Sequence, residues 1–482
     1  MKFTVQRANQ SVSEHAGSVV DTYRPSYHVL PPCGWINDPN GFCFYKGEYH
    51  LFCQFNPYSA EWANMHWGHW TSKDLIYWIW HGVSLAPDQP YDHFGCYSGH
   101  AIVDGDTLCL LYTGVRMDED GSEYQQQCLA RSDDGFMFVK SENNPVVPNA
   151  LQPEGSKAAD FRDPKVFRHG DGFRMMVASK GPSGGDYLFY DSRDLEHWTF
   201  VRKHIEGLGA MLECPDYFTL DGHTVTIASV MEMPPDGLRY PNTQPVVSML
   251  DVETRGPVCV SIDYGLDFYA PQSVLTPDGR RVMIGWLRSW GNDFPPRYLG
   301  HGWNNMMTIP RELRVENGVL VQYPLRELES LRANERAFSG VSFTAPHSRA
   351  CELRLIAVPC SARQLSLQMA KSEGEAFKIE YDVDRQVLRT DRSIAGYPMG
   401  KNGMPEEKPY REAVLPLKDG KLDLRIFLDT SSVEIFSADG SVSMSALFCP
   451  KGSADHLSVS SDDNSASFSL TIWDIIVKED SP

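Results

Sequence analysis

Several common catalytic signatures are missing from this chain of 482 residues. It has no glycine-rich phosphate loop followed by Lys-Ser or Lys-Thr, and no glycine fingerprint of a dinucleotide-binding unit. A serine nucleophile elbow is also missing. These absences argue against nucleotide-dependent chemistry and against a serine hydrolase, and no cofactor is expected.

Paired cysteines and long apolar runs are missing as well. The eleven cysteines are an odd number and include no C-x-x-C pair or zinc-type block, which favours free thiols in a reducing compartment. The segment Met1–Val20 lacks the apolar core of a signal peptide, and no stretch reaches membrane-spanning length. The sequence therefore predicts a cytoplasmic protein that does not associate with membranes.

Basic residues are fewer than acidic ones, 44 against 63, and the formal net charge is −19. Nucleic acids and anionic membranes require a basic footprint, so neither is expected as a partner, whereas a small neutral substrate is compatible with this charge. His66 and His69 have no further ligands at a recognisable spacing. We interpret both as buried, hydrogen-bonded histidines and expect no metal. The oligomeric state is not predicted.

A repeated hairpin pattern runs through the first two thirds of the chain. Alternating apolar residues flank a turn glycine five times, which is typical of β-hairpins, at Gly47, Gly105, Gly172, Gly222 and Gly279. The spacing between these glycines suits four-stranded units arranged radially. Five hairpins predict a five-bladed β-propeller in which the first strand of each blade lines the central channel.

Three carboxylates occupy matching places in this repeat. Asp38, Asp163 and Glu213 each lie nine residues ahead of a turn glycine, and a proline follows each within two positions. Side chains alternate along a strand, so an equal offset from the turn predicts that the three acids point into one channel mouth. Taken singly, the first acid would be assigned to a surface turn and the second to a local ion pair with Arg162. Their repetition favours acid–base and covalent sugar chemistry.

The domain boundaries follow the changes in pattern. Residues 1–26 form an N-terminal extension, and residues 27–310 form the propeller. Residues 311–336 are charged and leucine-rich, which predicts a linker with a short helix. Short alternating segments in residues 337–482 predict a β-sandwich, and the whole protein is expected to be all-β. Bracing the propeller is the role expected of the sandwich, and independent sugar binding is the alternative.

At this point the motifs resemble those of glycoside hydrolase family 32, which includes invertases, fructanases and sucrose-6-phosphate hydrolases. The three signature segments are Trp35–Gly41, Phe161–Pro164 and Glu213–Pro215. Further similarity continues in order to the end of the chain, at Leu51–Pro57, Trp67–His69, Tyr97–Gly99, Asp267–Gln272, Gly285–Leu287, Pro310–Leu313 and Ser432–Phe436. The family architecture, a five-bladed propeller followed by a β-sandwich, agrees with the fold that the repeat predicts.

The resemblance implies a role for each candidate residue. Asp38 matches the family nucleophile and Glu213 its general acid/base, while Asp163 with Arg162 matches the pair that holds fructose hydroxyls and stabilises the transition state. The remaining matches line the fructose pocket, and they are Asn37, Gln54, Trp62, Tyr97, Ser98, Tyr269 and Trp290. Ile36 stands where methionine is commoner, which is a volume-conserving exchange.

These residues imply a retaining β-fructofuranosidase that acts on sucrose, sucrose 6-phosphate or short fructo-oligosaccharides. A fructosyltransferase or an exo-fructanase acting on inulin or levan is an alternative within the family. A non-catalytic fructan-binding protein and an inverting propeller glycosidase acting on arabinose polymers are further alternatives. The sequence leaves the leaving group and the ratio of hydrolysis to transfer open.

Overall fold

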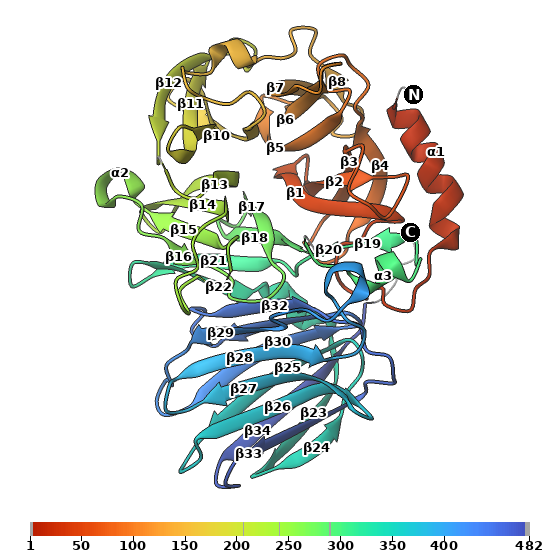
Figure 1. Ribbon diagram of the computed structural model, residues 1–482, viewed down its shortest axis with the longest axis vertical. Coiled ribbons are helices and arrows are strands. Elements are labelled where there is room, and N and C mark those ends of the chain that lie inside the picture. Colours follow the sequence, from red (N-terminus) through yellow and green to blue (C-terminus); the bar gives the residue numbers. More distant parts are fainter. Residues whose placement is uncertain (1–2, 206, 241, 289–290, 478–482) are drawn as a thin grey trace.

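The computed structural model describes residues 3–205, 207–240, 242–288 and 291–477. Within these residues, strands up to Pro324 form five sheets around a common axis, antiparallel except for one short parallel pairing in the first sheet (Figure 1). The first two blades contain β1 (Gly34–Tyr45), β2 (Glu48–Asn56), β3 (His66–Ser72), β4 (Ile79–Leu85), β5 (Gly95–Asp104), β6 (Thr107–Met117), β7 (Glu123–Ser132) and β8 (Val139–Lys140). The third and fourth contain β9 (Phe161–His169), β10 (Gly172–Gly181), β11 (Gly184–Ser192), β12 (Thr199–His204), β13 (Met211–Leu220), β14 (His223–Met231), β15 (Val246–Leu250) and β16 (Val260–Ser261).

The fifth blade and the closure of the ring use residues that are distant in sequence. The blade contains β17 (Tyr269–Leu275), β18 (Arg281–Leu287), β21 (Arg311–Glu316) and β22 (Val319–Pro324). Between β18 and β21, the short strand β19 (Trp303–Asn304) pairs with β1, and β20 (Met306–Met307) pairs with β18. This segment ties the last blade to the first. The innermost strands β1, β5, β9, β13 and β17 contact one another in a closed ring, so the predicted five-bladed propeller is confirmed.

Alternation along the strands builds the core between blades. In β6, Leu110 packs with residues of the first blade, whereas its neighbour Leu111 packs with residues of the third. In β10, Met175 faces the second blade and Met176 faces the fourth. Because both faces of each blade are covered, consecutive residues of these strands are apolar and fully buried.

The predicted linker at 311–336 is wrong for most of its length. Residues 311–324 form β21 and β22, joined by a two-residue turn at Asn317 and Gly318, both of which have positive φ. That Asn-Gly pair is a strong hairpin signal, and it was hidden by the charged residues around it. Only Arg326–Leu331 forms a short 3₁₀ helix, and the next domain begins at Arg332 rather than at residue 337.

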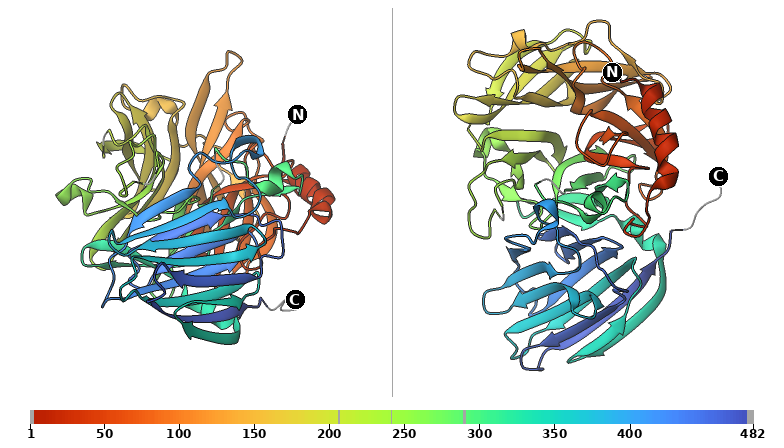
Figure 2. Two further views of the ribbon diagram at one scale, coloured as in Figure 1. Left: turned by 60° about the horizontal axis from the view of Figure 1, so that its bottom comes forward. Right: turned by 45° about the vertical axis from the view of Figure 1, so that its right-hand side comes forward.

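The C-terminal domain is a sandwich of two six-stranded antiparallel sheets packed below the propeller (Figures 1 and 2). One sheet has the order β23 (Arg332–Gly340), β34 (Ser467–Ile475), β25 (Cys351–Val358), β30 (Leu422–Asp429), β31 (Ser432–Ser437) and β32 (Ser443–Leu447). The other has the order β24 (Phe343–Pro346), β33 (His456–Ser461), β26 (Gln364–Ser372), β27 (Glu375–Asp382), β28 (Val387–Ile394) and β29 (Tyr410–Val414). An apolar cluster between the sheets forms its own core.

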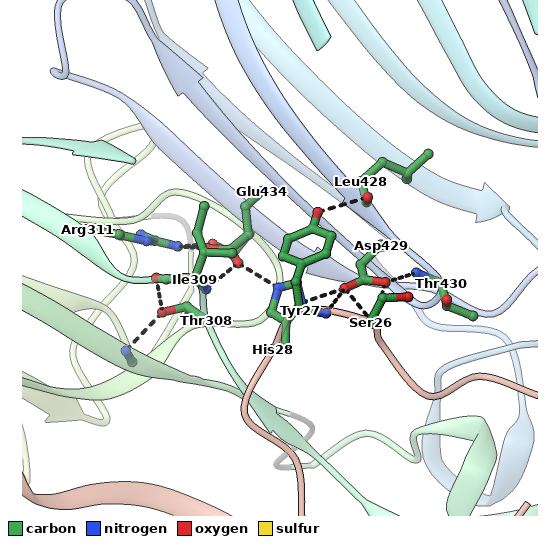
Figure 3. Close-up of polar contacts among 12 residues, drawn as sticks. Ser26, Tyr27, His28, Thr308, Ile309, Arg311, Leu428, Asp429, Thr430 and Glu434 are labelled. Atoms are coloured by element: carbon green, nitrogen blue, oxygen red, sulfur yellow. Dashed lines mark hydrogen bonds and ion pairs between the residues drawn. The ribbon is translucent and has the colours of Figure 1, made fainter. Parts of the chain in front are cut away.

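A buried ionic cluster joins the two domains (Figure 3). Nδ1 of His28 lies 2.8 Å from Oδ2 of Asp429, and its Nε2 lies 3.2 Å from Oε1 of Glu434. Arg311 of β21 places Nη2 2.6 Å from the other oxygen of Glu434 and Nη1 2.9 Å from Asp263. Because both partners of each pair are almost completely buried, separating the domains would leave unpaired charges.

Helices are few and lie at the edges. The helix α1 (Val5–His15) contacts β4 on the outside of the first blade, and Oγ1 of Thr4 caps it by accepting a hydrogen bond from N of Arg7. Two single-turn helices, α2 (Val252–Arg255) and α3 (Pro295–Tyr298), lie in loops of the propeller. None of the helices within the described ranges has the length and apolarity required to cross a membrane.

Candidate active site

A cavity of about 370 Å³ opens at one end of the propeller ring. Its walls are built from the innermost strands, from other strands of the same blades and from the connections between strands. The three predicted catalytic acids line this cavity together, so their predicted convergence is confirmed. The other lining residues are Asn37, Gln54, Trp62, Tyr97, Glu123, Gln125, Ala159, Asp160, Arg162, Met231, Gln244, Tyr269, Trp286 and Arg288.

Every innermost strand has a β-bulge where it reaches the cavity. The register to the neighbouring strand slips between Ile36 and Pro39, Tyr97 and Gly99, Arg162 and Lys165, Glu213 and Asp216, and Tyr269 and Gln272. The extra residue bends the strand and redirects its side chains, which is a common device next to active sites. Asp163, Cys214 and Ala270 have positive φ at these bulges, an unusual conformation for residues other than glycine.

Asp38 lies in β1 and accepts hydrogen bonds from neighbouring strands. Its Oδ2 is 2.6 Å from Oγ of Ser98, 2.8 Å from Nε2 of Gln54 and 3.5 Å from Sγ of Cys214. Burial raises the pKa of Asp38, the hydrogen bond from Ser98 lowers it, and the charge of Glu213 raises it. The carboxylate is thus oriented by donors that favour its ionised form.

Asp163 lies at the bulge of β9. Its Oδ2 accepts a hydrogen bond from N of Cys214 at 2.9 Å, and its own N donates to Oγ1 of Thr113 at 2.9 Å. Burial raises the pKa of Asp163, Arg162 opposes that effect, and the charges of Glu213 and Asp38 add to it, so that the pKa is raised to about 7. Its backbone and carboxylate are both held in place.

Glu213 precedes the bulge of β13 and contacts both a cation and a phenol. Nε and Nη2 of Arg162 lie 3.0 and 2.9 Å from its Oε1, and the hydroxyl of Tyr269 donates to its Oε2 at 2.7 Å. Arg162 also donates from Nη1 to Gln125 at 3.2 Å and to Asp160 at 3.3 Å. Each oxygen of Glu213 therefore has its own donor, which fixes the plane of the carboxyl group.

The structure places the other predicted pocket residues as follows. Asn37, Gln54, Trp62, Tyr97, Arg162 and Tyr269 line the cavity. Ser98 lies behind Asp38, which it contacts, and is buried. The ring of Trp62 meets that of Tyr97 edge-on at 5.7 Å and is 36% exposed, so an aromatic rim is open to solvent. Trp290 lies outside the described residues.

Several lining residues were not predicted from the sequence. Gln125 belongs to the run of glutamines at 125–127 in β7, and a polar run of that kind inside a buried strand is a signal that could have revealed it. Trp286 was noted only as part of a motif, and Arg288 follows the end of β18. Glu123, Asp160, Met231 and Gln244 carry no signal, because strand ends and connections that are distant in sequence bring them to the cavity.

The two histidines considered as metal ligands lie in the interior of the first blade. Nδ1 of His66 lies 2.5 Å from the carbonyl oxygen of Asn64, and Nε2 of His69 lies 3.0 Å from Nδ1 of His50. Both side chains are buried and hydrogen-bonded, as expected from the sequence. Among the described residues, no group of three or more His, Cys, Asp and Glu side chains could hold a metal ion.

Comparison with known proteins identifies the family. The profile of the Glycosyl hydrolases family 32 N-terminal domain matches residues 28–324, and that of the Glycosyl hydrolases family 32 C-terminal domain matches residues 327–474. A probable sucrose-6-phosphate hydrolase of Psychromonas ingrahamii is 37% identical, with 92% of this chain and 80% of that protein covered. A sucrose-6-phosphate hydrolase of Escherichia coli is 35% identical, with 94% of each chain covered.

Solved structures agree with these relatives. A β-fructofuranosidase of Bombyx mori, whose D63A mutant was solved in complex with sucrose, superimposes with a TM-score of 0.82 at 31% identity and 98% coverage of each chain. The sucrose-6-phosphate hydrolase of Lactobacillus gasseri has a TM-score of 0.84 at 26% identity, with 98% of this chain and 99% of that chain covered. The chain therefore belongs to glycoside hydrolase family 32 and is a glycosidase.

Proposed function

We propose that this glycosidase hydrolyses the terminal β-D-fructofuranosyl bond of sucrose or sucrose 6-phosphate with retention of configuration. The observation that carries the proposal is the placement of Asp38, Asp163 and Glu213 in one cavity with different hydrogen-bond partners. Two carboxyl groups in different environments suit the two roles that a retaining glycosidase requires. The relatives named as sucrose-6-phosphate hydrolases and the β-fructofuranosidase solved with sucrose support sucrose or its 6-phosphate as the substrate.

The first step transfers the fructosyl group to the enzyme. Oδ1 or Oδ2 of Asp38 attacks the anomeric carbon C2, while the carboxylic acid of Glu213 gives its proton to the glycosidic oxygen. The C2–oxygen bond breaks, the leaving sugar departs as an alcohol, and a fructosyl ester of Asp38 forms. Ser98 and Gln54, which donate to Asp38, hold the nucleophile in position for this attack.

The second step releases fructose. The carboxylate of Glu213 removes a proton from a water molecule, whose oxygen attacks C2 from the face that the leaving sugar vacated. The bond from C2 to Asp38 breaks, and both acids return to their starting states. Tyr269 and Arg162 keep Glu213 within reach of the same face in both steps.

Asp163 is assigned to substrate binding rather than to proton transfer. Its carboxylate is fixed by N of Cys214 and is neighboured by Arg162. We infer that it accepts hydrogen bonds from fructose ring hydroxyls, which become better donors as positive charge develops at C2. Asn37 and the aromatic rim of Trp62 and Tyr97 complete the sugar-binding wall in this proposal.

Methanol trapping tests the mechanism. Methanol competes with water for the fructosyl-enzyme and yields a methyl fructofuranoside whose configuration is stable. NMR of that product should show the β anomer, and an α product would contradict the retaining mechanism. Asp38→Ala should reduce kcat at least about a thousandfold, or ~4 kcal/mol in activation free energy, with an unchanged circular dichroism spectrum. Near-normal turnover in that variant would exclude Asp38 as the nucleophile.

Analysis of the products and of fructan binding addresses the alternatives left by the sequence. Oligosaccharide products at high sucrose would indicate a fructosyltransferase, and steady release of fructose from inulin or levan would indicate an exo-fructanase. Binding of fructan without any release of fructose would indicate a non-catalytic protein. Inversion at the anomeric carbon would indicate the chemistry of an arabinan-type propeller glycosidase.

A cytoplasmic location remains part of the proposal. All eleven cysteines are free thiols, and ten of them are buried. Thiols that persist unpaired fit a reducing compartment. Fractionation of the cells that produce the protein should recover its activity with cytoplasmic markers.

A further inference from the structure

Arg288 presents an unused cation at the cavity wall. It follows β18 directly, and its guanidinium carbon lies 4.7 Å from the centre of the Tyr269 ring. Its Nε is buried without a hydrogen-bond partner. In the part of the chain that the structure describes, no carboxylate forms an ion pair with this guanidinium, so its bonding capacity is available to a ligand.

Arg162, the other arginine that lines the cavity, shows the contrast. Its nitrogens are engaged by Glu213, Gln125 and Asp160. Those bonds use its donors to hold protein groups in place. Arg288 has no such duty among the described residues and instead stacks on an aromatic ring, which leaves the donors at the edge of its planar fork free to bind an anion.

The position of Arg288 assigns it to the leaving-group side of the cavity. The Tyr269 ring beneath it carries the hydroxyl that donates to Glu213, the acid proposed to protonate the departing oxygen. The sugar that leaves with that oxygen must lie next to this acid. Arg288 therefore contacts the same tyrosine that holds Glu213, beside which the leaving sugar must bind.

The sandwich domain supports this wall. Nδ2 of Asn292 donates to Oε1 of Glu406 at 3.0 Å, and N of Asp293 donates to the carbonyl oxygen of Met399 at 3.0 Å. Glu406 is held in turn by Arg392, whose Nε lies 2.6 Å from its Oε2. Asn292 and Asp293, which lie a few positions after Arg288, are thus anchored to the second domain.

The electrostatics require a cation at this place if the substrate carries an anion. Asp38, Asp163 and Glu213 lie in the same cavity and would repel a phosphate group. The positive charge nearest to the cavity that is not already neutralised by a described carboxylate is that of Arg288. A phosphate dianion matches the bidentate geometry of a guanidinium better than a neutral hydroxyl does.

We propose that Arg288 binds the phosphate of a phosphorylated leaving sugar and thereby makes the enzyme prefer sucrose 6-phosphate to sucrose. This inference rests on the proposed fructosyl hydrolysis and names the residue that selects between its two candidate substrates. The phosphate is held by hydrogen bonds and charge alone, and no covalent step is involved.

Steady-state kinetics on both substrates test the inference. Arg288→Gln should lower kcat/KM for sucrose 6-phosphate by about 10- to 150-fold, the range for hydrogen bonds to a charged group, and should change kcat/KM for sucrose less than about threefold. Arg288→Lys should recover part of the loss. Arg193→Gln is the matched control, because it removes the same charge from an exposed site on the third blade and should change neither substrate. Equal losses on both substrates, or no loss on either, would overturn the assignment.

Binding of products separates this inference from the proposed function. Calorimetry should show that glucose 6-phosphate binds the wild-type protein more tightly than glucose does, and that Arg288→Gln removes the difference. This measurement requires no hydrolysis. If the wild-type protein cleaves neither substrate, the proposed function fails, whereas equal affinity for the two sugars refutes only the role of Arg288. Should Arg288→Gln fail to fold, Arg288→Lys, which keeps the charge but loses the planar fork, should show a smaller preference for glucose 6-phosphate than the wild type, and an undiminished preference would overturn the assignment.

Discussion

The hydroxyl oxygen of Ser98 lies 2.6 Å from Oδ2 of Asp38, although the two residues belong to different blades. Ser98 occupies the bulge of β5, and the bulge turns its side chain toward β1. This hydrogen bond lowers the pKa of Asp38 against the opposing effect of burial. The second blade therefore helps to keep ionised a nucleophile that the first blade supplies.

Ser98→Ala should weaken catalysis without disturbing the fold. Loss of a hydrogen bond to a carboxylate costs ~1.5–3 kcal/mol, so kcat/KM should fall about tenfold or more. Because the lost bond lowered the pKa of Asp38, the acidic limb of the pH profile of kcat/KM should move to higher pH. Ser98→Thr, which keeps the hydroxyl, should retain the original limb. An acidic limb that does not move in Ser98→Ala would assign this limb to another group.

Tyr269→Phe should reduce kcat more than it raises KM. The variant removes the hydroxyl that lies 2.7 Å from Oε2 of Glu213 but keeps the ring under Arg288. A misoriented general acid forfeits part of its usual 10²–10⁴-fold contribution, so we expect a loss of about 10- to 100-fold in kcat. Tyr190→Phe is the matched control, because its hydroxyl bonds to the carbonyl of Leu151 in another part of the fold. Steady-state kinetics on sucrose should separate the two variants.

The convergence of the three acids could be predicted from the sequence, but their exact positions could not. By strand register Glu213 precedes its bulge, Asp163 is the first bulged residue and Asp38 the second. The equal spacing to the turn glycines is therefore not an equal position in the blade. Strand β1 contains a second bulge between Asn40 and Cys43, which accounts for one residue of the difference, and Gly172 pairs with His169 at the start of β10 rather than lying in the turn. A bulge adds one unpaired residue to a strand, and no residue type signals it in the sequence. The strand register therefore cannot be obtained by counting residues from the turn.

The residues missed from the sequence share a physical reason. Gln125 reaches the cavity from β7 and Arg288 from the residue after β18, and the apolar pattern of these strands indicates burial but not the direction of one polar side chain. The hairpin of β21 and β22 was missed because its first strand is rich in charged residues, of which Arg314 pairs with Glu312 along the same strand. The radial repeat could be recognised because every blade must bury both faces, which leaves apolar runs on both sides of each turn.

Lys165→Met should destabilise the propeller below the active site. Nζ of Lys165 lies 2.6 Å from Oδ1 of Asp216, and both side chains are buried. Removal of one partner of a buried pair leaves the other uncompensated, so the free energy of unfolding should fall by ~3–5 kcal/mol. Adding Asp216→Asn should recover part of the loss, which a double-mutant cycle measures. Lys73→Met, in a pair that is largely exposed, should cost less than ~1 kcal/mol in the same urea titration.

The raised pKa of His28, which joins the two domains, predicts that the stability of the folded protein depends on pH. Burial alone would lower the pKa of His28, but hydrogen bonds to Asp429 and Glu434 reverse this and raise it to about 9. Because the folded pKa lies above the unfolded value of ~6.5, the stabilisation is complete below pH ~6.5 and is lost as the pH rises to about 9. The shift corresponds to roughly 3 kcal/mol.

Thermal unfolding of the wild-type protein and of His28→Gln between pH 6 and pH 9.5 tests this linkage. The difference between their melting temperatures should be largest at pH 6 and should shrink toward pH 9.5, because protonated His28 joins two carboxylates of the sandwich to the propeller. His197→Gln is the control, since its pair with Asp194 is exposed and should contribute little at any pH. A difference that stays constant over this range would show that His28 has the same charge in the folded and unfolded protein.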